Sequence, residues 1–229
     1  MNMNIGRKLP IGIQTFEKIR EGDYIYVDKT ELVWKMAATA TPYFLSRPRR
    51  FGKSLLLSTF EAYFEGKKEL FKGLAIEQLE QEWKKYPVLH LDLNAEKYDS
   101  PERLDDILSR QLTQWELRYD KGPDENTLAG RFSGIIRRAS QQAGCGVVVL
   151  VDEYDKPLLQ ALGNDDLMEE YRKTLKAFYG VLKSADRYLR FAFLTGVTKF
   201  SQVSVFSDLN QLQDISMNYY YSAICGITK

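Results

Sequence analysis

Histidine and cysteine are nearly absent from this sequence of 229 residues. The chain has one histidine, His90, and two cysteines, Cys145 and Cys225. Two cysteines are too few for a disulfide framework, and a single histidine argues against a zinc site or a serine–histidine triad. Any hydrolytic chemistry would therefore depend on carboxylates and a metal ion. We expect His90 to be a core residue whose hydrogen bonds are satisfied.

Long apolar runs are also missing. No segment approaches the roughly 20 apolar residues of a membrane-spanning helix, and residues 1–16 lack the apolar run of a signal peptide. We therefore expect a cytoplasmic protein with no membrane partner. The formal net charge of +1 gives no overall bias toward nucleic acid. A hydrophobic content of 44% is enough for a globular chain to bury a core.

Apolar runs predict four strands, at residues 43–46, 88–93, 147–151 and 191–195. Three of these runs are almost continuously apolar, which is typical of parallel strands buried on both faces. Helical patterns lie between them, at residues 54–64, after Pro101 with Ser100 as the cap, and at residues 167–182. This alternation predicts an α/β fold with three layers, in which helices flank a mainly parallel central sheet.

The two ends of the chain are less regular. Residues 1–40 predict a lead-in segment, with a short strand at residues 24–27 and a helix from about Thr30. Asp28 and Glu31 would form a capping box at the start of that helix. Residues 121–127 predict an exposed loop. Residues 223–229 remain apolar in character, so we expect the chain to continue in a longer protein.

The first predicted strand leads into a basic turn and then into Gly52-Lys53-Ser54 at the start of a helix. This is the layout of a phosphate-binding loop, whose backbone N–H groups cradle phosphates at a helix N-terminus. Lys53 would reach the β- and γ-phosphates, and Ser54 would hold Mg²⁺. The pattern requires a glycine five residues before Gly52, where this chain has Arg47. The residues expected to bind the nucleotide are Arg47, Arg49, Arg50, Phe51, Gly52, Lys53, Ser54 and Leu55.

The third predicted strand ends in Asp152-Glu153, which we interpret as a Walker B motif. Ligands bind beyond the carboxyl ends of strands in open α/β sheets, so Asp152 would join Ser54 in holding Mg²⁺. Glu153 would orient and deprotonate the attacking water. Thr195, at the end of the fourth strand, would either sense the γ-phosphate or merely cap the strand. Asp92 would face the site or bond locally. Arg190 and Lys199 could supply positive charge to the transition state, but we expect both on the solvated surface.

Taken together, these segments resemble the bacterial and archaeal AAA-ATPase-like family. The similar segments are residues 9–12, 24–30, 47–54, 151–157, 195–200, 206–210 and 214–216. The resemblance implies a P-loop NTPase fold with an additional strand and a catalytic glutamate, one domain over residues 1–229, an ATP ligand and Mg²⁺. It also implies that arginine is usual at position 47. Members often carry a C-terminal PD-(D/E)XK nuclease-like domain, which we expect beyond residue 229 and not within these residues.

The leading functional hypothesis is a Mg²⁺-dependent ATPase whose hydrolysis drives a conformational change, with Lys53, Glu153 and Thr195 as its catalytic residues. The alternative is a nucleotide-gated interaction module with little or no turnover, because Arg47 and Pro48 stiffen the loop. Nucleic-acid binding through the arginines is a weaker third hypothesis. No aromatic platform of the kind that stacks on single strands accompanies those arginines.

Overall fold

A parallel sheet forms the middle layer of the structure, a computed structural model that describes residues 8–94, 96–199, 205–207, 209 and 211–226. All strand pairs are parallel, which confirms the predicted α/β class and a P-loop NTPase-like fold. The strand order is β2 (Val88–Asp92), β3 (Val147–Asp152), β4 (Leu189–Gly196), β1 (Tyr43–Ser46) and β5 (Gln213–Asp214). Phe200, Asp208, Asn210 and residues 227–229 lie outside the described residues.

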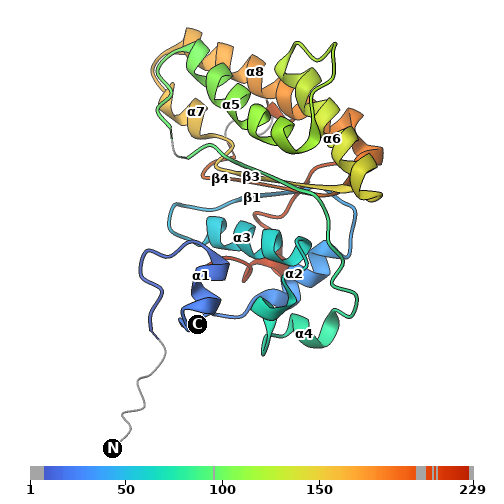
Figure 1. Ribbon diagram of the computed structural model, residues 1–229. Helices are drawn as coiled ribbons and strands as arrows, with labels where there is room; N and C mark the ends of the chain where they lie inside the picture. The colour runs from blue at the N-terminus through green and yellow to red at the C-terminus, as the bar shows by residue number, and fades with distance from the viewer. Residues whose placement is uncertain (1–7, 95, 200–204, 208, 210, 227–229) are drawn as a thin grey trace, which may run out of the picture.

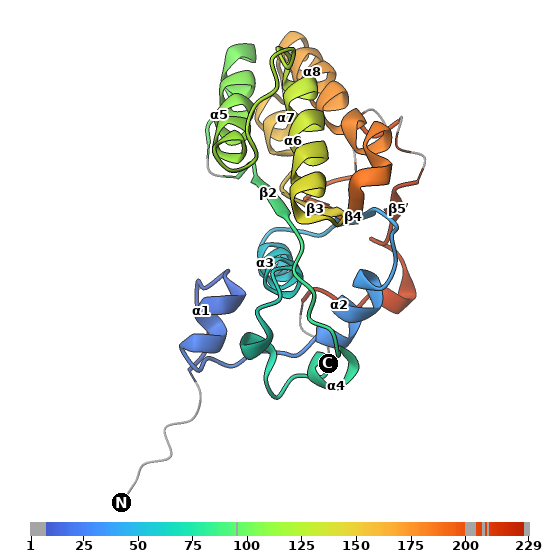
Figure 2. The same ribbon diagram turned by 45° about the vertical axis from the view of Figure 1, so that its right-hand side comes forward.

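Helices cover both faces of the sheet, giving the predicted three layers (Figures 1 and 2). One face carries α5 (Pro101–Tyr119), α6 (Leu128–Ala143), α7 (Lys156–Gln160) and α8 (Asp165–Ser184). The other face carries α1 (Phe16–Glu21), α2 (Thr30–Ala37), α3 (Lys53–Phe64) and α4 (Ile76–Leu79). Short 3₁₀ turns are η1 (Lys68–Phe71), η2 (Asp186–Tyr188) and η3 (Tyr219–Tyr221).

Strand β3 is buried on both faces, and its alternation decides where its last residue points. Val147, Val149 and Val151 belong to the core beneath α5–α8, whereas Val148 and Leu150 belong to the core beneath α2 and α3. Because side chains alternate along a strand, Asp152 faces α3. Full burial of each such side chain stabilises the fold by about 1.5–3 kcal/mol.

The lead-in segment differs from the prediction. Residues 24–27 are not a strand: among the described residues only Tyr24 forms a bridge, with Lys8, and no strand of the described ranges pairs with them. Tyr26 instead packs edge-on against Phe16 of α1, with ring centroids 5.0 Å apart. Helices α1 and α6 and strand β5 were not predicted. Residues 121–127 do form a loop, although Glu125 within it is buried.

Two predicted helix caps are corrected by the structure. Pro101 does occupy the first turn of α5, but the Ser100 hydroxyl accepts no hydrogen bond from that helix. Lys29, not Asp28, holds the N-cap position of α2. Asp28 still serves the helix start, because its Oδ1 accepts from the Thr30 N–H at 2.8 Å. Glu31 pairs with Lys35 one turn later, so the expected capping box is not formed.

His90 on β2 is only partly satisfied. Its Nδ1 lies 2.9 Å from Glu61 Oε2 of α3, while its buried Nε2 has no hydrogen-bond partner among the described residues. Burial works to lower the pKa of His90, but the carboxylates of Glu61, Asp152 and Asp92 together hold that pKa above its usual value of 6.5. Burial works to raise the pKa of Glu61, but the hydrogen bond to His90 and the charges of His90 and Lys67 together lower it.

We predict that Glu61→Gln lowers the pKa of His90, because burial persists while the carboxylate charge is lost. The ion pair between His90 and Glu61 stabilises the fold below about pH 6.5, and this stabilisation is lost as pH rises through the raised pKa of His90. The Glu61 contribution fades in acid, as pH falls through its lowered pKa. The stability loss on substitution should therefore be largest near pH 5–6, on the order of 1 kcal/mol, and smaller at about pH 8.5.

NMR titration measures this pKa directly, because a single histidine gives a single set of ring signals. Glu69→Gln is the matched control, because Glu69 is exposed in the 3₁₀ turn η1 that follows α3. This substitution should leave the His90 pKa unchanged. An unaltered His90 pKa in Glu61→Gln would contradict the assigned cause.

Candidate functional site

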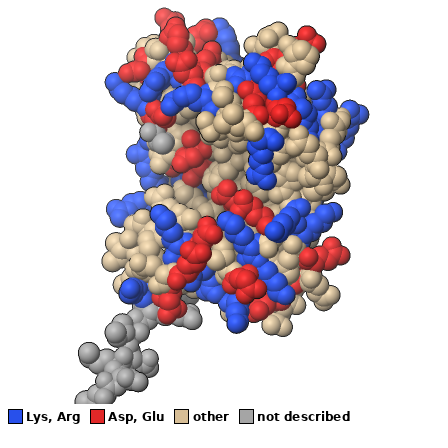
Figure 3. Space-filling view, in the orientation of Figure 1, with Lys and Arg blue, Asp and Glu red and all other residues tan. Residues whose placement is uncertain are grey.

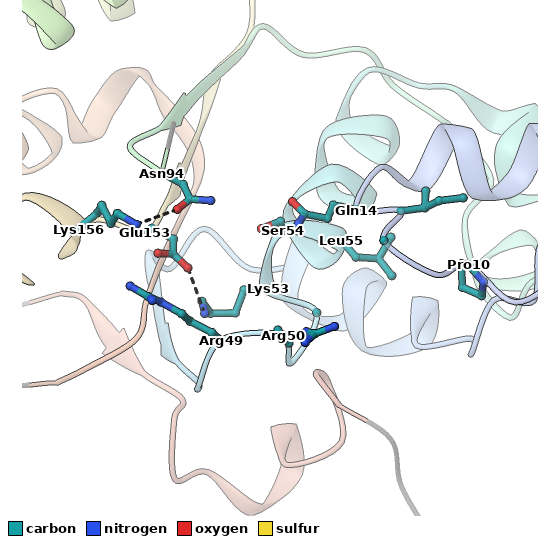
Figure 4. Close-up of a pocket in the computed structure, with 13 residues that line it drawn as sticks. Pro10, Gln14, Arg49, Arg50, Lys53, Ser54, Leu55, Asn94, Glu153 and Lys156 are labelled. Carbon is teal, nitrogen blue, oxygen red and sulfur yellow. Dashed lines mark hydrogen bonds and ion pairs between the residues drawn. The ribbon is translucent and has the colours of Figure 1, made fainter. Parts of the chain in front are cut away.

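A cavity of about 460 Å³ opens beyond the carboxyl ends of β1 and β3 (Figure 4). Seven of the predicted nucleotide or catalytic residues line it: Arg49, Arg50, Gly52, Lys53, Ser54, Leu55 and Glu153. Its other walls were not predicted from the sequence and comprise Pro10, Gly12, Ile13, Gln14, Asn94 and Lys156. The structure thus brings the two predicted motifs, about a hundred residues apart, to one cavity.

The N-terminus of α3 is open toward an anion. Gly52 occupies the N-cap with φ of 87°, in the left-handed region that favours glycine. No side chain caps the helix, and its first turn has no acidic residue. The first N–H groups of a helix lack partners within the helix and carry partial positive charge. This end of α3 therefore presents the donors that a phosphate requires.

Lys53 turns back toward the loop and the end of β3. Its side chain is only 4% exposed, and its Nζ donates to the Arg47 carbonyl at 3.0 Å. The same Nζ lies 3.6 Å from Glu153 Oε1. In this state the lysine charge is balanced by protein groups, which an incoming phosphate would replace.

Asp152 connects three elements through its carboxylate. Ser54 Oγ of α3 donates to Oδ2 at 2.5 Å, and Thr195 Oγ1 of β4 donates to Oδ1 at 2.6 Å. Thr195 faces α3 for the same reason as Asp152, since Phe191 and Phe193 on its strand belong to the core beneath α2 and α3. The predicted pair of metal ligands, Ser54 and Asp152, is therefore in contact.

Glu153 is buried and its backbone is strained. The residue is 7% exposed, and its φ of 52° lies in the left-handed region, which costs a non-glycine residue about 1–3 kcal/mol. Its Oε2 is buried and has no hydrogen-bond partner in the part of the chain that the structure describes. A carboxylate oxygen of this kind can accept a proton from a water in the cavity.

Asp155 clamps the segment that follows β4, a role that no sequence motif indicated. Its fully buried carboxylate accepts from the Val197 N–H at 3.0 Å and from the Thr198 N–H at 2.8 Å. Gly196 lets the end of β4 lie close to the turn that follows β3, because a Cβ at position 196 would come within 2.4 Å of the Tyr154 ring. The turn after Glu153 is thereby fixed to the end of β4.

A second cavity, of about 420 Å³, adjoins the first and is mostly apolar. The two cavities share Pro10, Ile13, Arg50, Gly52 and Leu55. Residues that line only the second include Ile25, Val27, Phe51, Leu56, Ile224 and Cys225. Burial raises the pKa of the Cys225 thiol to about 12, so this thiol is uncharged at neutral pH.

Several predicted residues lie elsewhere than expected. Arg47 lines neither cavity, because its guanidinium donates to the Ser216 carbonyl at 2.5 Å. Thr195 is fully buried behind Asp152 and also lines neither cavity. Asp92 bonds locally, accepting from the Asn94 N–H at 2.8 Å.

The two basic residues expected on the solvated surface both have partners. Arg190 is half-buried and donates to the Ala37 and Thr39 carbonyls at the end of α2, which corrects the prediction. Lys199 pairs with Asp214 at 2.9 Å. On the face that Figure 3 shows, basic and acidic residues are interspersed, with no large field of one sign.

The parallel sheet with helices on both faces, and the loop between β1 and α3, define a P-loop NTPase-like protein. A family model described as Predicted AAA-ATPase matches residues 10–206, and the chain belongs to this AAA-ATPase-like family. It is also 45% identical over 224 residues to an Azotobacter chroococcum mcd 1 protein described as "Uncharacterized protein in vnfD 5'region". That alignment covers 97% of this chain but 43% of the relative, so the chain spans less than half the relative's length. No solved structure matches the chain.

The described residues show neither a membrane span nor a cluster of metal ligands. Within the described ranges, no helix has both the length and the apolar character needed to cross a bilayer. The same part of the chain has no cluster of three or more histidine, cysteine, aspartate or glutamate side chains suited to a metal.

We predict that Asp155→Asn destabilises the fold by about 1–3 kcal/mol, because an amide places a donor against backbone N–H groups. Urea denaturation measures the change. Asp106→Asn, at an exposed position on α5, is the matched control and should change stability by no more than about 0.5 kcal/mol. Equal effects of the two substitutions would contradict the clamp.

Proposed function

We propose that this chain binds ATP and hydrolyses it with the help of Mg²⁺, and that hydrolysis drives a conformational change. One observation carries the proposal: the N-terminus of α3, with Lys53 and Ser54, and Glu153 line one cavity, and Asp152 lies directly behind Ser54 at hydrogen-bond distance. Membership of the AAA-ATPase-like family supports nucleotide binding. We further propose that residues 1–229 act as one nucleotide-binding domain, with residues 1–40 as its lead-in segment.

The residues present fit a magnesium ion. Mg²⁺ prefers oxygen ligands and in phosphate-transfer sites takes only one or two from the protein, the rest coming from water and phosphates. Ser54 and Asp152 supply such oxygens side by side, and the absence of a larger acidic cluster among the described residues agrees with this mode. When bound, the ion would neutralise charge on the β- and γ-phosphates.

The apolar second cavity favours a nucleotide over a bare polyphosphate. It adjoins the phosphate loop at Gly52, and its volume of about 420 Å³ is within the range of small-molecule sites. A flat, uncharged base would remove apolar surface from water there. The choice of adenine over guanine follows from the family and not from a base-reading side chain.

Glu153 is the proposed general base. A water oxygen would bond to the γ-phosphorus while the bond from that phosphorus to the β–γ bridging oxygen breaks, and Glu153 would take the proton of the water. Phosphate binding to Lys53 would release Glu153 from its present contact at 3.6 Å. Thr195 would act indirectly, by orienting the Asp152 carboxylate.

The Lys53–Glu153 contact also favours the alternative, a nucleotide-gated module with little turnover. In this state the base and the lysine are engaged with each other, so nucleotide binding alone would change the site. Strong ATP binding with negligible single-turnover hydrolysis would favour this alternative. A nuclease-like domain beyond residue 229, nucleic-acid binding and a cytoplasmic location stay predictions.

We predict that Glu153→Gln keeps ATP binding but lowers the rate of turnover by about 10²-fold or more, because the amide cannot take the proton. Single-turnover hydrolysis beside equilibrium ATP binding separates the two effects. A Glu153→Gln protein that hydrolyses ATP at the parent rate would exclude Glu153 as the base.

Lys53→Ala is the contrasting variant, because it removes the charge that reaches the phosphates. It should lose both ATP affinity and turnover, whereas Glu153→Gln should lose turnover alone. Retained ATP affinity in Lys53→Ala would place the phosphates outside this loop.

A further inference from the structure

We propose that Lys156 is a second cationic contact for the terminal phosphate of the bound nucleotide, positioned by Asn94, and that it distinguishes a nucleoside triphosphate from a diphosphate. This inference rests on the proposed nucleotide site. It assigns the contact to a residue of the same chain.

The backbone of Lys156 is held rigidly over the end of β3. Its N–H donates to the Glu153 carbonyl at 2.9 Å, which folds the chain back directly after the proposed base. The two intervening residues, Tyr154 and Asp155, are fully buried. The Tyr154 N–H donates to the Thr195 carbonyl at 2.9 Å, and Asp155 clamps the segment after β4. These contacts fix the backbone from which the Lys156 side chain extends toward the cavity.

The Lys156 side chain has a neutral partner. Its Nζ donates to Asn94 Oδ1 at 3.2 Å, and Asn94 is held at the end of β2 by its N–H bond to Asp92. Among the described residues Lys156 forms no ion pair with a carboxylate, unlike Lys35 and Lys173 on the outer surface. An amide oxygen fixes the position of the ammonium group without neutralising its charge. Both Lys156 and Asn94 line the first cavity.

The position of Lys156 in the cavity suits a contact with the terminal phosphate of a bound nucleotide, and not with the inner phosphates. Figure 4 shows Lys156 and Asn94 on the side of Glu153 away from Lys53 and the phosphate loop. If the loop cradles the inner phosphates, the phosphate that reaches past Lys53 toward Glu153 is the one under attack. A diphosphate ends before this point, so Lys156 would add affinity for the triphosphate only. A cation placed there also stabilises the charge of the transferring phosphoryl group.

Arg49 is the other candidate for this contact, but the structure favours Lys156. Arg49 lines the cavity from the loop side and is exposed, and no hydrogen bond or ion pair positions its guanidinium among the described residues. A residue without a positioning partner loses more side-chain freedom on binding. We therefore expect Arg49→Ala to weaken triphosphate and diphosphate binding by similar factors.

The test compares the affinities of Mg²⁺-ADP and of a Mg²⁺-ATP analogue with a non-cleavable β–γ bridge, measured by calorimetry. Lys156→Ala should weaken analogue binding by about tenfold or more and change ADP binding by less than about twofold. Lys156→Gln keeps a hydrogen bond to Asn94 without the charge and should show the same loss. Lys156→Arg should recover part of it, and Asn94→Ala should give a smaller loss in the same direction.

Lys183→Ala is the matched control, since Lys183 is an exposed residue in the last turn of α8, shortly before the start of β4, and does not line the cavity. It should alter neither affinity, and thermal unfolding should show that all variants fold. Equal losses for ADP and the analogue in Lys156→Gln, or no loss for either, would overturn the role of Lys156 alone. A parent protein that binds neither nucleotide would overturn the proposed function and this inference together.

Discussion

The Asp152 carboxylate is the interaction on which the site depends. It accepts hydroxyl hydrogen bonds from Ser54 and Thr195, and so joins the end of β3 to the start of α3 and the end of β4. This contact requires β3 and β4 to keep their register, because a shift of one residue would turn Asp152 or Thr195 to the opposite face. The apolar faces of these strands fix that register. The same burial that stabilises the sheet therefore positions the proposed metal ligands.

The loop between β1 and α3, residues 47–52, is held by contacts outside the cavity as well as within it. Arg47 donates to the Ser216 carbonyl, and the Gly226 N–H donates to the Phe51 carbonyl at 2.9 Å. Residues 213–226 thus contact both ends of the loop that would carry the phosphates. The hydrogen bond from Arg47 to Ser216 supports the loop, which explains how the loop tolerates arginine where the phosphate-loop pattern has glycine. A change in the shape of the loop on nucleotide binding would therefore alter the contacts that residues 213–226 make with it.

Much of this arrangement was predictable from local patterns. The four apolar runs, Gly52-Lys53-Ser54 and Asp152-Glu153 indicated the sheet, the loop and the acidic pair, because each depends on contiguous residues. Asn94, Lys156 and Asp155 were missed, since their roles arise only when the ends of β2, β3 and β4 come together. Residues 24–27 were taken for a strand because sequence pattern does not reveal whether a neighbouring strand exists. The sequence pattern predicts Arg47 at the nucleotide and leaves Thr195 open between a γ-phosphate sensor and a strand cap, because their protein partners, Ser216 and Asp152, are distant in sequence.

A crystal structure with Mn²⁺ and a non-cleavable ATP analogue tests the central claim most directly, because anomalous scattering locates the metal independently of the nucleotide. We predict the triphosphate at the N-terminus of α3, the metal bound to Ser54 Oγ beside Asp152, and Glu153 separated from Lys53. A nucleotide bound elsewhere, or an empty cavity at a saturating concentration of the analogue, would contradict the account.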